Sequence, residues 1–152
     1  MKRVGRLEEA HKYYLKSMEL DSTNPIFQYN TGVLYNIKSE YDKAVDMLER
    51  SIERNPENVY AYLALGDALE RKKETAKAIT VYKELMSQGI PVHGLDEKLK
   101  YLEKAHEESV KKEKEAHEKE LAAKFAELEV EKAENEKKAK EMAEKMAQFE
   151  EM

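Results

Sequence analysis

The sequence predicts an all-α protein in which pairs of helices repeat and are followed by one long charged helix. Small and apolar residues recur at intervals of 34 along the first two thirds of the 152-residue chain. After residue 94 there is no glycine or proline, and Glu, Lys and Ala dominate. Charged residues make up 39% of the chain, against a usual share of about a quarter. That excess is typical of long helices with solvated faces.

The 34-residue recurrence places residues of similar size at equivalent positions. Gly32 aligns with Gly66 and Asn24 with Asn58. The other matches are Ala10 with Ala44 and Ala78, Tyr14 with Leu48 and Tyr82, and Met18 with Ile52 and Met86. A repeated packing geometry requires this pattern. Because each glycine costs about 1 kcal/mol inside a helix, we expect the two glycines to let a neighbouring helix approach closely.

The first complete unit consists of two predicted helices. Asn24 should cap a helix that begins at Pro25, where the missing N–H costs nothing, and that runs to about Lys38. A short turn leads to a second helix, which ends at Asn55-Pro56. Apolar residues recur in both helices at intervals of three and four, which predicts one buried stripe on each.

The beginning of the chain matches only the second helix of a unit. Such a helix leaves part of its apolar face uncovered, so either the sequence is a fragment of a longer array or another chain covers this end. The predicted organisation is a half repeat (1–22), two complete units (23–57 and 58–92), a capping helix (93–106) and a charged helical extension (107–152).

The last third of the chain has the composition of a self-supporting helix. Leu95, Leu99 and Leu102 form one apolar stripe that should pack on the last repeat. Glu–Lys pairs at i,i+4 then contribute about 0.2–0.5 kcal/mol each to helix stability. Residues 103–152 hold 16 acidic and 11 basic side chains, which accounts for the whole net charge of -5. As a single helix, residues 95–152 would be about 87 Å long.

A heptad pattern runs through this tail. Its strong apolar members, the assembly seam, are Leu121, Phe125, Leu128, Met142, Met146 and Phe149. Their spacing alternates four and three, as in coiled coils, but Lys132 and Asn135 occupy core positions in the middle. The tail is therefore predicted to be a weak, self-associating coiled coil, a solitary charge-stabilised helix or a helix bound to a partner. A disordered tail ranks third, behind the coiled coil and the solitary helix, because the Ala, Glu, Lys, Met and Leu content favours a helix.

The sequence offers no arrangement for catalysis or for a cofactor. It contains no cysteine, which excludes a thiol nucleophile and thiolate-bound zinc. Glycine-rich phosphate loops and nucleophile-elbow motifs do not occur. Glu113 and His117 lie one helical turn apart without a third ligand, so no stable metal site is predicted. We predict a protein that is not an enzyme and binds no cofactor or metal.

Net charge and hydropathy also restrict the classes of partner that the protein can have. A net charge of -5 disfavours a nucleic-acid surface, which needs a basic field. No apolar run approaches 18 residues, so no membrane association is predicted. The expected location is the cytoplasm, including cytoskeletal or ciliary structures, and the expected partners are other protein chains.

The helix-turn-helix period of 34 resembles the tetratricopeptide repeat family. The family pattern alternates small and large apolar residues, and the two units supply Gly32, Tyr35, Ala44, Leu48, Ser51 and Pro56, then Gly66, Leu69, Ala78, Tyr82 and Leu85. The usual Trp at the fourth position is replaced by Gln28 and Tyr62. The resemblance covers residues 5–92 and implies a right-handed solenoid of about two and a half units.

The resemblance also implies a concave groove lined by the first helix of each unit. The groove positions, here called the A-helix face, are Ile26, Tyr29, Asn30, Val33, Asn36, Tyr60, Leu63, Ala64, Asp67 and Glu70. Rigid aromatic residues such as Tyr29 and Tyr60 are typical of binding hot spots. We expect this face to hold an apolar helix or an extended segment of a partner protein, unless these side chains pack between the helices or the tail folds back on them.

Three functions follow from these features, and the first is favoured. It is a protein–protein interaction scaffold or adaptor, with the tail as a spacer or assembly rod. The second is a structural component of a large filamentous or microtubule-based assembly. The third is a chaperone cofactor. Chaperone-binding members of the family grip a C-terminal carboxylate with Lys and Arg; Asn30 matches their asparagine, but Tyr60 and Ala64 replace the basic residues.

Overall fold

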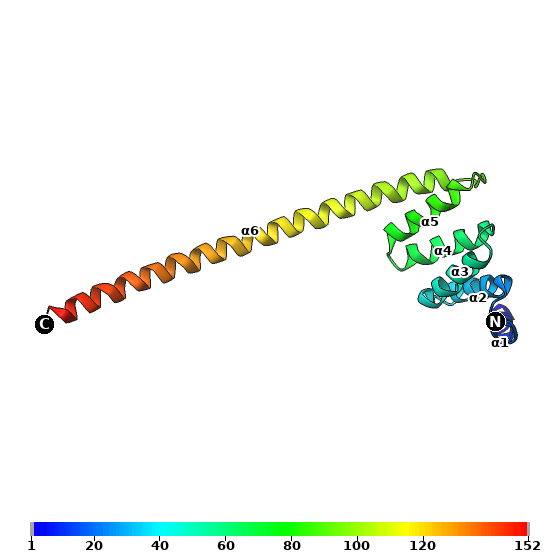
Figure 1. The fold of residues 1–152 in the computed structure, drawn as a ribbon, viewed down its shortest axis with the longest axis horizontal. Coiled ribbons are helices and arrows are strands. Elements are labelled where there is room, and N and C mark those ends of the chain that lie inside the picture. The colour runs from blue at the N-terminus through cyan, green and yellow to red at the C-terminus, as the bar shows by residue number, and fades with distance from the viewer. Residues whose placement is uncertain (1, 152) are drawn as a thin grey trace. The chain divides into compact units, whose positions relative to one another are not determined.

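The computed structural model describes residues 2–151 and is entirely helical (Figure 1). Its helices are α1 (Lys2–Leu20), α2 (Pro25–Ile37), α3 (Tyr41–Arg54), α4 (Val59–Arg71), α5 (Thr75–Ser87) and α6 (Leu95–Glu150). Consecutive helices from α1 to α5 pack against one another, and α2 also contacts α4. The all-α class and the succession of helical hairpins followed by a long helix are confirmed.

Local sequence explains where the first helix of each hairpin begins. Asn24 accepts a hydrogen bond from the amide of Ile26 at 2.9 Å, and Pro25 follows it as the first helical residue. Asn58 accepts from the amide of Ala61 at 3.4 Å in the same way. The N-cap predicted at Asn24 is therefore present, as is its counterpart one repeat later at Asn58, and each satisfies a backbone N–H that the helix leaves unpaired.

The turns inside the two hairpins have the same construction. Ser39 and Lys73, exactly one repeat apart, adopt the left-handed conformation with φ values of 62° and 66°. In each turn the next residue's amide reaches back to a carbonyl: Glu40 to Tyr35 at 2.9 Å and Glu74 to Leu69 at 2.9 Å. The chain thereby reverses direction with its helix-terminal carbonyls hydrogen-bonded.

The two repeated glycines let the helices of each hairpin approach closely. A Cβ atom at Gly32 would lie 2.7 Å from Cγ of Leu48, and one at Gly66 would overlap the ring of Tyr82 and lie 2.7 Å from its hydroxyl oxygen. Leu48 and Tyr82 are almost completely buried. The prediction from the repeat pattern is confirmed, with a different residue over each glycine.

One hydrophobic core runs through α3, α4, α5 and the first turns of α6. Its buried members are Ala44, Leu48, Tyr62, Leu65, Ala68, Leu69, Ala78, Ile79, Tyr82, Leu85, Leu95, Leu99 and Leu102. The last three are the leucines of the predicted apolar stripe. Their burial fixes the N-terminal part of α6 in this core, because each fully buried leucine contributes about 1.5–3 kcal/mol.

Helix α1 packs against α2 around a buried histidine. His11 places its ring edge-on to Tyr35, with ring centroids 4.8 Å apart. Glu8 pairs with Lys38 at 3.1 Å beside it. Tyr13 and Leu20 of α1 are exposed to solvent. This helix therefore has one packed face and one face with apolar side chains in water.

The chain divides into two units, Met1–His106 and Glu107–Met152. In the second unit α6 continues as a regular helix to Glu150, and every described side chain is exposed. Of the predicted Glu–Lys pairs, Glu120–Lys124 closes as an ion pair at 3.1 Å. Within residues 2–151, no helix combines the length and the apolarity needed to cross a bilayer.

Candidate partner-binding site

The A-helix face is built on α2 and α4, which are tied directly to each other. The side-chain amide of Asn36 donates to the carbonyl oxygen of Ala64 at 3.0 Å. At the other end of α2, the hydroxyl of Ser51 donates to the carbonyl of Pro25 at 2.8 Å. These bonds hold α2 against both α4 and α3, so the residues on the face have a fixed relative position.

The apolar part of the face lies in the first turns of the two helices. Ile26 and Tyr60 occupy equivalent positions of successive units and are 62% and 69% exposed. Tyr29, one turn beyond Ile26, is half-buried, and Leu63 stands one turn beyond Tyr60. Exposed apolar side chains grouped in this way mark interaction surfaces in soluble proteins.

The phenol of Tyr60 lies close enough to Tyr29 to affect the ionisation of Tyr29. Burial raises the pKa of Tyr29 above its usual value, and the nearby phenol of Tyr60 raises it further. Tyr29, Leu63 and Ala64 also pack against the hydrophobic core. The structure therefore brings the two aromatic residues of the predicted face together, with Tyr60 as the solvent-facing member.

Several polar members of the face are already engaged within the fold. Glu70 accepts a hydrogen bond from the hydroxyl of Tyr82 at 2.6 Å and pairs with Lys98 at 2.9 Å. Asp67 pairs with Arg71 at 3.4 Å. Asn30 and Val33 are half-buried between the apolar turns and this polar end. The free surface is thus mainly apolar at the start of the helices, with the carboxylate of Asp67 further along.

Sequence reasoning missed the network around Tyr82. The Lys98 ammonium lies 5.2 Å from the centre of the Tyr82 ring, and the Tyr82 hydroxyl donates a hydrogen bond to Glu70. Burial, followed by the neighbouring carboxylate of Glu70, raises the pKa of Tyr82. The only signal in the sequence was an aromatic residue at a position where the first unit has Leu48. That substitution does not specify a polar partner.

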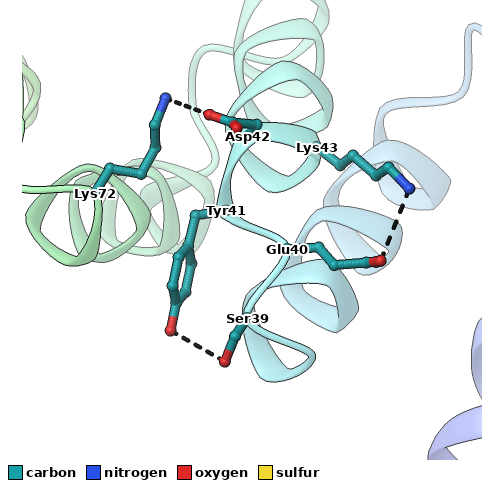
Figure 2. A pocket seen from close by; sticks show the side chains of 6 residues that line it. All are labelled: Ser39, Glu40, Tyr41, Asp42, Lys43 and Lys72. Carbon is teal, nitrogen blue, oxygen red and sulfur yellow. Dashed lines mark hydrogen bonds and ion pairs between the residues drawn. The ribbon is translucent and has the colours of Figure 1, made fainter.

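A hollow lies at the turn between α2 and α3, away from the A-helix face (Figure 2). It measures about 380 Å³ and is lined by Ser39, Glu40, Tyr41, Asp42, Lys43 and Lys72. Its charged groups are paired, with Lys72 2.6 Å from Asp42 and Lys43 3.8 Å from Glu40, and the Tyr41 hydroxyl lies 3.2 Å from that of Ser39. This arrangement stabilises the turn and leaves no unpaired charge for a ligand.

The assembly seam of the tail is exposed along its length. Leu121 is the least exposed member, at 47%, and Phe149 the most, at 78%. Among the residues that the structure describes, no group of three His, Asp or Glu side chains could hold a metal ion.

Fold and surface together define an α-helical repeat protein with an exposed apolar face. The sequence profile described as tetratricopeptide repeat matches residues 38–89. This segment is therefore similar to a tetratricopeptide repeat, as the resemblance predicted, and such repeats serve as protein–protein interaction modules.

Solved structures show the same fold. The first TPR of Spaghetti (RPAP3) bound to HSP90 peptide SRMEEVD has 20% identity and a TM-score of 0.61, over 68% of this chain and 82% of that chain. The Sgt2 TPR domain from Aspergillus fumigatus has 19% identity and a TM-score of 0.63, over 72% and 74%. The N-terminal domain of stress-induced protein-1 from C. elegans has 25% identity and a TM-score of 0.56, over 63% and 80%.

Proposed function

We propose that this chain is a protein-interaction adaptor whose A-helix face binds an apolar helix or an extended segment of another protein. The observation that carries the proposal is the exposure of Ile26 and Tyr60 beside Tyr29 on two helices held in fixed register. Tyr60 supplies a large, rigid contact surface at low conformational cost. In this proposal the charged tail acts as a spacer or assembly rod.

The proposed ligand is an apolar segment because the face offers little else. Ile26, Tyr29, Val33 and Leu63 supply apolar surface, whereas the side-chain NH₂ group of Asn36 and the carboxylate of Glu70 already form hydrogen bonds inside the fold. A partner with two apolar side chains one helical turn apart would cover Ile26 and Tyr60 together. Burying about 100 Å² of apolar surface contributes roughly 2.5 kcal/mol.

A chaperone-cofactor role is the alternative suggested by the solved structure with a bound HSP90 peptide, SRMEEVD. Two acidic side chains precede the C-terminal residue of that peptide. In this chain Tyr60 and Ala64 stand where the family's clamp has basic side chains, and the carboxylate of Asp67 lies on the same face. Like charges repel, so we rank capture of an acidic peptide second.

A role as a structural component of a filamentous or microtubule-based assembly is the other alternative. It is favoured by the exposed Tyr13 and Leu20 on α1, which another chain could cover. In that case the A-helix face would be permanently occupied, and the protein would be poorly soluble when purified alone.

The test is affinity capture with three full-length baits: the wild type, Ile26→Ser/Tyr60→Ala, and Tyr101→Ala. Tyr101 is 72% exposed on α6 and lies outside the A-helix face, so its variant controls for the loss of an exposed tyrosine. We expect the captured amount of each wild-type partner to fall at least about tenfold with the double variant, since hot-spot losses are about 2 kcal/mol or more and tenfold corresponds to about 1.4 kcal/mol, and to persist with the control.

Retention of all partners by Ile26→Ser/Tyr60→Ala would contradict the proposal. Circular dichroism of each bait confirms that these surface changes leave the fold intact.

The same proteins are then titrated with the peptide SRMEEVD at low and high salt. Salt-sensitive binding by the wild type would favour the chaperone alternative.

A further inference from the structure

The assembly seam lies on one face of α6 and follows a heptad. Phe125 and Met146 occupy a positions, and Leu121, Leu128, Met142 and Phe149 occupy d positions. All six side chains are exposed in the single chain. A stripe of this kind gains stability when another helix covers it, because apolar surface leaves water.

The charges beside the stripe favour a second copy of the same helix in the parallel direction. In a parallel pair aligned in register, each g position faces the e position five residues later on the other helix. Lys124 then faces Glu129, and Lys145 faces Glu150. By symmetry each dimer contains four such attractive contacts, two at each end of the apolar stripe.

The middle of the stripe is polar and sets the alignment. Glu131 would face Glu136 of the other copy, which is repulsive. The two copies of Lys132 share the a layer between these glutamates, and each ammonium lies beside the other copy's Glu131, which offsets the repulsion between the glutamates and between the lysines. A polar residue at an a position costs stability but specifies register, because any shift would place the lysine among apolar side chains.

An antiparallel pair is less favourable. The antiparallel alignment that covers most of the seam places Phe125 opposite Met142. In this direction g faces g and e faces e. Lys124 then meets Lys145 and Glu129 meets Glu136, which are repulsive contacts, whereas Glu131 meets Lys138, which is attractive. Repulsive contacts therefore outnumber attractive ones in the antiparallel pair, and the reverse holds in the parallel pair.

We propose that residues 121–150 pair with the same residues of a second copy as a weak, parallel, in-register two-stranded coiled coil. This inference deepens the assembly-rod part of the proposed function and rests on it. Partner binding by the A-helix face is measured with different variants. Failure of the coiled-coil proposal can therefore be distinguished from failure of the proposal that the A-helix face binds a partner.

The first test is an exchange of charges in the full chain. One variant carries Lys124→Glu/Lys145→Glu and the other Glu129→Lys/Glu150→Lys. Each variant should associate at least about tenfold more weakly than the wild type, because all four Lys–Glu contacts at the ends of the apolar stripe become repulsive. An equimolar mixture should regain dimers, since all four contacts are then attractive. Sedimentation equilibrium at increasing concentration measures these masses.

Three outcomes would overturn the proposal. In the first, the wild type stays monomeric at millimolar concentration, which would indicate that the seam binds a different protein and not a second copy of this chain. In the second, both variants dimerise as well as the wild type. In the third, the two variants fail to associate when mixed, although circular dichroism shows unchanged helix content.

The second test determines the direction of the helices. The chain has no cysteine, so Met142→Cys introduces a single thiol at a d position. In a parallel dimer the two thiols share one layer and should form a disulfide under mild oxidation. Lys137→Cys, on the outer side of the helix, is the matched control and should not. A dimer in which Met142→Cys fails to crosslink would exclude the parallel arrangement.

Discussion

Gly66 and Tyr82 show how one absent methyl group sets the distance between two helices. The ring of Tyr82 occupies the space that a Cβ atom at position 66 would need, and its hydroxyl is fixed by Glu70 at 2.6 Å. The ring cannot move away without breaking this hydrogen bond. The glycine is therefore a packing requirement of the second hairpin.

Gly66→Ala should lower the free energy of unfolding by about 1–3 kcal/mol, because it overpacks a buried contact. Gly5→Ala is the control, since an added Cβ at Gly5 meets no other atom within 4 Å. In α1 that change should raise stability by up to about 1 kcal/mol through helix propensity. Urea denaturation of both proteins checks the opposite signs, and equal midpoints would disprove the packing explanation.

At the scale of the elements, the hairpin turns carry strain that a different residue would relieve. Lys73 has a φ of 66°, a backbone conformation that residues other than glycine rarely adopt. The residue is exposed, so its side chain contributes little packing in return.

Lys73→Gly should therefore raise the free energy of unfolding by about 0.5–1 kcal/mol, as measured by thermal or urea denaturation. Glu84→Gly is the matched control, because it places glycine at an exposed position inside α5, where about 1 kcal/mol should be lost. A loss of stability in both variants would contradict the strained turn.

The packing of α1 on α2 should depend on pH through His11. Burial, followed by the charge of Lys38, lowers the pKa of His11 below its ordinary value of 6.5. Lys43 acts in the same direction, and the carboxylates of Glu40 and Glu8 oppose it. Nε2 of this imidazole is buried without a hydrogen-bond partner in the described part of the chain.

Because the folded state binds this proton less readily than the unfolded state, His11 favours folding fully above the ordinary pKa. That contribution is lost as the pH falls through the lowered value. The wild type should be less stable near pH 5.5 than near pH 7.5. His11→Gln should reduce this difference, whereas His93→Gln, which alters an exposed loop histidine, should retain it. Identical slopes in all three proteins would exclude His11 as the cause.

At the scale of the whole molecule, the periodic features were predictable from sequence. Residue spacing in the sequence determines three of them. These are the caps at Asn24 and Asn58, the close helix approach at Gly32 and Gly66, and the apolar stripe of α6. Such features follow from the repeat, because each position must meet the same environment one unit later.

The partners of polar side chains were less predictable. Asn36 and Glu70 occupy groove positions by their phase, yet one bonds to the carbonyl of Ala64 and the other to Tyr82 and Lys98. These contacts join residues from different helices, and their geometry depends on tertiary packing. Helical phase predicts which face a residue lies on and leaves open whether its side chain remains available to a partner.

The matching turns at Ser39 and Lys73 have a consequence for how a protein of this kind can lengthen. Both junctions close with the same backbone bonds at the same distances, including Ala44 to Glu40 and Ala78 to Glu74 at 3.1 Å. If a copy of residues 41–74 were inserted after residue 74, Glu74 would precede a second Tyr41, just as Glu40 precedes the first, and the second Glu74 would precede Thr75 as it does now. Growth by duplication therefore needs no new type of junction, and the array can gain one hairpin in a single genetic event.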